Sequence, residues 1–255
     1  MTTLVLAAHG ARDARWAEVM DRVAARVRLA RPGTPVELGF LELSAPPLAE
    51  ALARARGPVV VVPLLLTGGY HAYVDLPAVV ARARPDAVVA GHLGPHPLLA
   101  SVLARRLASA GLRPCDTVVL GAAGSCDRDA LADARAAARL LAVRLSRPVT
   151  AAFVASGTPP IAEALDRARS GPAPRVAVAS YLLAPGFFHD RLKECGADLV
   201  SEPLGADDDL AALVWARFDE VAATAAGTPC RGRARCTAAE PAAGQPSVPR
   251  SLRRR

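Results

Sequence analysis

Short apolar segments alternate along the chain with segments of helical periodicity. Residues 4–8 form a continuous apolar run of the length expected for a strand that is buried on both faces. Behind this run, Val19, Val23 and Val27 recur every four residues and predict an amphipathic helix, which Asp13 can cap. The next predicted strands lie at 36–41, 59–66 and 87–90. Three further helices are predicted: one that opens at Pro46-Pro47, one at 74–84 and one at 97–110. This order predicts an α/β fold with a mainly parallel sheet covered by helices.

The same pattern then starts again, which indicates an internal duplication. VLAAHGARD at 5–13 resembles VLGAAGSCD at 119–127, and PPLAEAL at 46–52 matches PPIAEAL at 159–165. The segment from Leu64 to His71 matches the segment from Leu182 to His189 in the same order, so the offset stays between 113 and 118 residues. We therefore predict two similar α/β domains, residues 1–112 and 113–226, that face each other across a cleft.

The last residues, 227–255, differ in composition from the rest of the chain. They are rich in Arg, Pro and Ala and offer almost no large apolar side chain, so we expect a disordered tail. Seven of the chain's arginines and one acid lie there, which gives the tail +6 and leaves only +1 of the total charge of +7 for residues 1–226. A nearly neutral body argues against a nucleic-acid partner.

Composition excludes several other classes of protein. Hydrophobic residues make up 52% of the chain, which is enough for a sizeable core. The five cysteines form no CxxC pair, so neither a disulfide framework nor a zinc knuckle is indicated. The N-terminus lacks the basic segment of a signal peptide, and no apolar run approaches the length of a membrane span. We expect a cytoplasmic protein with no membrane partner.

Three residues of the first half follow successive predicted strands. His9 comes directly after the first strand, Glu42 ends the second, and His71 lies in the loop after the third. Ligands of parallel α/β sheets bind at the carboxyl ends of the strands. Two imidazoles and a carboxylate can hold a divalent metal or accept protons near neutral pH. Each residue alone has a plainer interpretation, as a helix cap or a dipole partner, but one from each strand end favours a joint site.

These motifs resemble the sirohydrochlorin chelatase family, the class II chelatases that insert cobalt or ferrous iron into a tetrapyrrole without ATP. The resemblance rests on strand-His-Gly-x-Arg-Asp at the N-terminus, on Phe-Leu-Glu before a Pro helix, and on PLLLTGGYH at 63–71. It covers residues 1 to about 226, and the long members of the family are fused repeats. It implies that His9 and His71 handle the metal, with Glu42 as the third group, and that the protein is a lyase of cobalamin or siroheme biosynthesis.

A tetrapyrrole substrate with many carboxylates also favours particular residues around this site. Arg12 can meet a carboxylate at the cleft edge, Gly68 and Gly69 can let the backbone approach a flat ligand, and Tyr70 can pack on it. The divalent metal is then a substrate, and no other cofactor is expected. Whether the protein acts as a monomer or a homodimer stays open, as does the choice between cobalt and iron.

The second half departs from the family pattern. Ala123 stands where His9 stands and Ala155 where Glu42 stands, so only His189 persists and one working site is expected. His92 and His96 are expected at a rim or turn, because Pro95 and Pro97 argue against a helix that would hold both.

Other functions fit parts of the sequence less well. A hydrolase would need G-x-S-x-G, and an ATP-driven chelatase would need a phosphate-binding loop, and neither motif is present. A non-catalytic carrier of divalent metal or tetrapyrrole would use the same ligands, so only turnover separates it from a chelatase.

Overall fold

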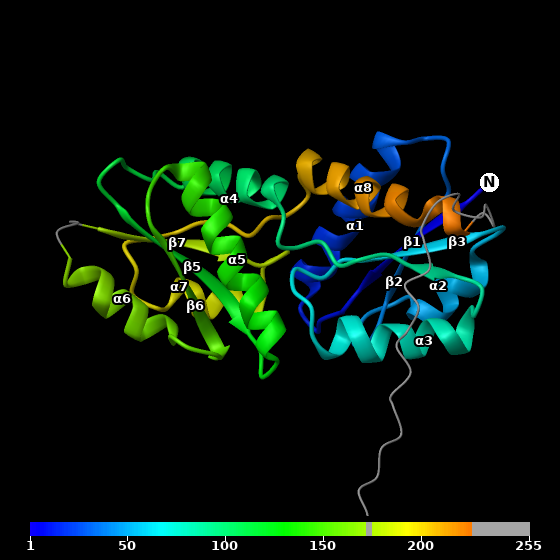
Figure 1. Cartoon of the computed structure of the whole chain (residues 1–255), viewed down its shortest axis with the longest axis horizontal. Helices are drawn as coiled ribbons and strands as arrows, with labels where there is room; N and C mark the ends of the chain where they lie inside the picture. The colour runs from blue at the N-terminus through cyan, green and yellow to red at the C-terminus, as the bar shows by residue number, and fades with distance from the viewer. Residues whose placement is uncertain (172–174, 226–255) are drawn as a thin grey trace, which may run out of the picture.

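The computed structural model describes residues 1–171 and 175–225, which form two α/β bodies (Figure 1). The predicted tail at 227–255 lies outside the described residues. The first body's elements, in chain order, are β1 (Thr3–Ala8), α1 (Ala14–Ala30), β2 (Val36–Phe40), α2 (Leu48–Arg54), β3 (Val59–Pro63), the π-helical turn η1 (His71–Asp75), α3 (Leu76–Ala83) and β4 (Val88–Val89). The elements that follow are α4 (Pro97–Ser109), β5 (Thr117–Gly124), α5 (Arg128–Leu145), β6 (Val149–Ser156), α6 (Ile161–Arg169), β7 (Val176–Tyr181), α7 (Phe187–Lys193), β8 (Leu199–Val200) and α8 (Asp208–Ala225).

Each body contains one four-stranded sheet, and the two sheets have the same topology. The strand orders are β2-β1-β3-β4 and β6-β5-β7-β8, and every pairing is parallel. β1, the central strand of the first sheet, is buried along its whole length, as its continuous apolar run requires. The predicted fold class, two similar parallel-sheet bodies from a duplication, is therefore confirmed.

The last helix of each repeat packs on the other repeat. α4 belongs to the first repeat by sequence but lies against α5 and β7, whereas α8 crosses back to α1, β3 and β4 (Figure 1). The indole of Trp215 on α8 is buried, and its Nε1 donates to the carbonyl oxygen of Val27 at 3.0 Å. The largest apolar core accordingly runs through both bodies. The boundary near residue 112 stays a prediction about the repeats, because the packing of the helices crosses it.

One segment differs from the sequence expectation in a way that matters for function. β3 ends at Pro63, and the helical segment begins at His71 rather than at residue 74. Since η1 continues directly into α3, His71 stands on the first turn of a helix and not in a loop. None of the helices in the described ranges is both long and apolar enough to cross a membrane.

Replacing Trp215 with Ala tests the packing of α8 against the first body. We expect the free energy of unfolding to fall by about 3–5 kcal/mol, because a large buried side chain and one hydrogen bond are lost. Val143→Ala is the matched control: this side chain on α5 is 79% exposed, so its truncation should change stability by less than about 0.5 kcal/mol. Denaturant unfolding measures both, and an equally small effect at Trp215 would contradict the packing described.

Candidate metal and substrate site

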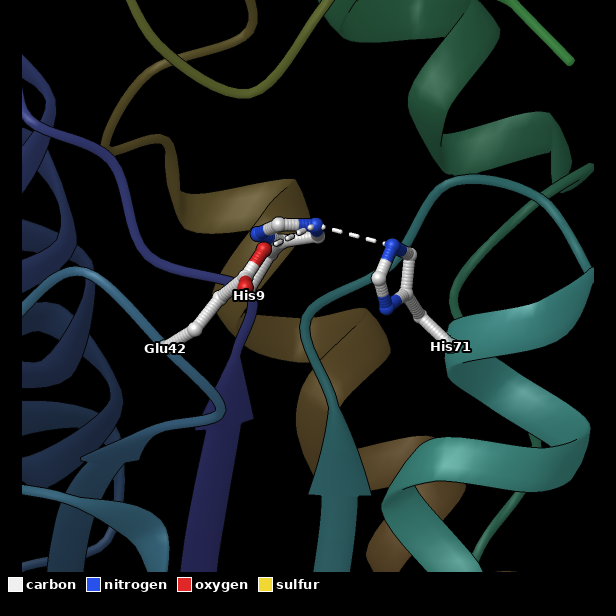
Figure 2. A group of neighbouring side chains, drawn as sticks. All are labelled: His9, Glu42 and His71. Carbon is white, nitrogen blue, oxygen red and sulfur yellow. Dashed lines mark hydrogen bonds and ion pairs between the residues drawn. The ribbon is translucent and has the colours of Figure 1, made fainter.

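The structure brings the three predicted ligands together at the carboxyl ends of β1, β2 and β3. His9 Nε2 lies 2.9 Å from His71 Nε2 and 3.3 Å from Glu42 Oε1 (Figure 2). One potential ligand atom from each of the three residues lies within 4.8 Å of the others. Since divalent ions bind imidazole nitrogen and carboxylate oxygen at about 2.0–2.2 Å, small side-chain movements suffice for all three to reach one ion. The donor set therefore fits a divalent metal.

Backbone geometry brings Glu42 to His9. Gly10 has φ +103°, and a Cβ there would lie 1.7 Å from the carbonyl oxygen of Glu42. The amide of Glu42 donates to the carbonyl oxygen of His9 at 2.9 Å, which continues the β1–β2 ladder past the end of β2. Only glycine permits this approach, so the His-Gly pair of the motif serves to place the carboxylate beside the imidazole.

The outer nitrogens of both imidazoles have partners of their own. His9 Nδ1 lies 3.1 Å from the carbonyl oxygen of Gly10, and His71 Nδ1 lies 3.3 Å from Asp75 Oδ2, one helical turn further on. Both contacts favour a proton on Nδ1 and leave Nε2 to face the site, as in the carboxylate–histidine–metal arrangement of metalloproteins. Sequence reasoning missed Asp75; the i, i+4 spacing from His71 on a helix was the signal that could have revealed it.

The site opens into a cleft between the two bodies. A cleft of about 570 Å³ is lined from the first body by His9, Arg12 and Leu43, and from the second by Leu183, Phe187 and Phe188. A narrower recess of about 230 Å³, also lined by His9, extends between the strand ends towards Tyr181. Leu43 and Phe187 are 54% and 70% exposed, so the mouth of the larger cleft offers apolar surface to a flat ligand.

Two arginines near this cleft, Arg15 and Arg12, differ in whether they are paired with carboxylates. Arg15 pairs with Asp13 at 2.6 Å and with Asp190 of α7 at 2.7 Å, and these contacts lower the pKa of both carboxyls and raise that of Arg15. Arg12, in contrast, is exposed and forms no ion pair within residues 1–171 and 175–225. Of these two guanidiniums, Arg12 is therefore the one without a carboxylate partner among the described residues, and its role in substrate binding stays a prediction.

The predicted glycines and Tyr70 occupy a different place from that of the other site residues. Gly68 lies under the ring of Tyr73, where a Cβ would come within 2.5 Å of the hydroxyl, and Gly69 faces Asp127 and Ala130 at the start of α5. Tyr70 is exposed beside His71, with ring centroids 5.8 Å apart. Among the described residues that line the two clefts, none of these three appears. Their role in substrate binding stays a prediction.

The remaining histidines have separate partners. His92 Nε2 lies 3.0 Å from Asp133 Oδ2, and His96 caps α4 by accepting from the amide of Leu98. His189, the counterpart of His71, is buried on α7, its Nε2 3.2 Å from the carbonyl oxygen of Ser201, and burial lowers its pKa. Ala123 and Ala155 offer it no second ligand, in line with the expectation of one working site.

The repeats match a known family twice. A family model described as CbiX aligns with residues 3–110 and again with residues 117–221. The chain belongs to the CbiX family. This confirms the resemblance to the sirohydrochlorin chelatases that the motifs predicted.

Curated relatives and solved structures agree with this assignment to CbiX. Proteins named sirohydrochlorin cobaltochelatase from Methanopyrus kandleri and Saccharolobus islandicus are 35% and 38% identical over 81 residues, which is 30% of this chain. The chain spans only 57% and 62% of the length of these two relatives. The structure of SirB from Bacillus subtilis with Fe³⁺ covers 89% of this chain and 97% of its own, with a TM-score of 0.73 and 23% identity. A structure described as CbiX, the terminal enzyme for biosynthesis of siroheme in denitrifying bacteria, has a TM-score of 0.66 at 24% identity, covering 86% of this chain and 98% of its own. At these identities the two structures show that the fold is shared.

Asp75→Asn tests how the imidazole of His71 is oriented. We expect the affinity for Co²⁺ to fall at least about 10-fold, because the carboxylate that favours the Nδ1 proton of His71 is lost. Asp21→Asn, a charge change on the exposed face of α1, is the control and should leave the affinity unchanged. Titration calorimetry with Co²⁺ gives both values. Equal affinities in the two variants would show that Asp75 does not orient His71.

His96→Asn tests the helix cap of α4 through the pH dependence of stability. Burial, with Arg217 nearby, lowers the pKa of His96, while Glu220 opposes this. The unfolded chain therefore takes up a proton near pH 6.5 that the folded chain resists, and the stabilisation by neutral His96 is lost as pH falls from there. Asn caps without titrating. We expect the melting temperature to fall less from pH 7 to pH 5 in the variant; the same fall in both proteins would contradict the assignment.

Proposed function

We propose that this protein is a metal chelatase that inserts Co²⁺ or Fe²⁺ into a sirohydrochlorin-type tetrapyrrole without ATP. The observation that carries the proposal is the convergence of His9, His71 and Glu42, together with a cleft that His9 lines with residues of both bodies. Membership of the CbiX family and the names of the curated relatives support the same reaction class. Structures of SirB with Fe³⁺ and with cobalt support both metals as candidates.

The reaction requires a planar macrocycle to lose two pyrrole N–H protons and gain a divalent ion. In the proposed mechanism His9 and His71 present the ion through their Nε2 atoms, and Glu42 provides the third ligand. As the ion passes to the ring nitrogens, the freed imidazoles and the carboxylate become bases that accept the pyrrole protons. One site can therefore deliver the metal and remove the protons, and no nucleotide is needed.

The cleft suits the shape and charge of such a substrate. Leu43 and Phe187 lie on opposite bodies and offer apolar contact to the faces of the ring. Arg12 lines the same cleft and forms no ion pair within residues 1–171 and 175–225, so its guanidinium is available for a peripheral carboxylate. The product would enter siroheme or cobalamin biosynthesis.

The deciding experiment follows the absorption spectrum of metal-free sirohydrochlorin during anaerobic incubation with the protein and Co²⁺ or Fe²⁺. His9→Ala and His71→Ala should lose most of the acceleration over spontaneous insertion, because each removes a ligand and a base. His189→Ala is the matched control and should keep its turnover number within a few-fold of the wild type. Wild-type turnover in His9→Ala would contradict the assigned site, and equal losses in His71→Ala and His189→Ala would contradict the single site. Stoichiometric binding without turnover would identify a carrier instead.

A further inference from the structure

The loop that leads to His71 is attached to the second body by two hydrogen bonds. This loop connects β3 with η1 and spans residues 64–70. The hydroxyl of Tyr181, at the end of β7, donates to the carbonyl oxygen of Leu66 at 2.9 Å. Two residues further on, the amide of Gly68 donates to Oδ2 of Asp133, on α5, at 2.7 Å. Both bonds cross from one repeat to the other, only a few residues before His71.

Asp133 contacts two separate segments of the first body. Its Oδ2 also lies 3.0 Å from Nε2 of His92, which belongs to the segment between β4 and α4. The ring of Tyr73, from η1, packs against His92 with centroids 6.0 Å apart and covers Gly68. One carboxylate oxygen of the second body is therefore shared by two groups of the first, and the ring of Tyr73 packs near both of them.

The side chain of Tyr181 is also held in one position by its surroundings. Its side chain is buried, and burial raises its pKa, so the hydroxyl stays protonated and donates. The hydroxyl fits beside Gly94, where a Cβ would come within 2.1 Å of it. Loss of this hydroxyl would leave the Leu66 carbonyl without the bond that fixes it.

We propose that Asp133 and Tyr181 are positioning residues, which the second body supplies to hold residues 66–68 so that His71 faces His9 and Glu42. The inference rests on the proposed function. The side chain of His71 is 41% exposed and stands on the first turn of η1, so its place depends on the backbone that precedes it. A displacement of about 1 Å at a reacting group is enough to lower activity strongly. The second body thus serves the site of the first, although Ala123 and Ala155 deprive it of a site of its own.

Co²⁺ binding to the full chain tests this role without the macrocycle. Asp133→Ala and Tyr181→Phe should each raise the dissociation constant for Co²⁺ at least fivefold, measured by the visible absorption of the bound ion. Asp133→Asn keeps an oxygen that accepts from Gly68 and should stay within twofold of the wild type. Asp129→Ala is the matched control: it removes the same charge from an exposed position of α5 and should have no effect.

A second readout separates positioning from loss of the fold. Hydrogen exchange of the peptide that contains residues 64–71 should quicken in Asp133→Ala and not in Asp129→Ala, while both variants melt within a few degrees of the wild type. In the chelatase assay, kcat should fall more than KM changes, because the ligand His71 moves while the apolar cleft does not.

Unchanged Co²⁺ affinity in both Asp133→Ala and Tyr181→Phe would overturn this inference and leave the proposed function intact. An Asp133→Asn variant as weak as Asp133→Ala would also overturn it, since the charge rather than the hydrogen bonds would then act. If the wild type and His71→Ala bind Co²⁺ equally, the metal role of His71 fails, and the positioning role fails with it.

Discussion

Two imidazole nitrogens that lie 2.9 Å apart cannot both present an unshared lone pair to each other without repulsion. The pair His9 Nε2 and His71 Nε2 therefore requires either a shared proton or a cation between the rings. The partners at both Nδ1 atoms favour protons on the outer side, so the two inner Nε2 atoms are left to face a cation such as a divalent metal ion.

Much of the architecture serves to bring these rings together. The parallel sheet places the carboxyl ends of β1 and β3 side by side, and Gly10 allows the turn after β1 to meet Glu42. Because α4 and α8 each pack on the other repeat, the two bodies share one apolar core. The apolar residues of α7 therefore lie across the cleft from His9. The duplication thus provides a second wall for the cleft rather than a second copy of the ligands.

The sequence predicted those features that depend on local patterns. The buried strands, the repeat and the three candidate ligands at strand ends all follow from apolar runs and from the motifs next to them, because residues after parallel strands share one edge of the sheet. It could not predict that α4 and α8 each pack on the other repeat, since an apolar helix face does not specify which sheet it covers. Gly68 and Gly69 lie against Tyr73 and the start of α5, contacts that no local sequence pattern reveals. The sequence predicted a helix only from residue 74, because the Gly-Gly pair at 68–69 indicates a turn, whereas the helical segment begins at His71.

The proposed function requires His9, His71 and Glu42 to form one metal site. Cobalt K-edge X-ray absorption of the protein loaded with one equivalent of Co²⁺ tests it most directly. We expect the multiple-scattering signature of two imidazoles with additional oxygen ligands, and the loss of one imidazole in His71→Ala. A spectrum with oxygen ligands alone, or one that is the same in the wild type and His71→Ala, would contradict it.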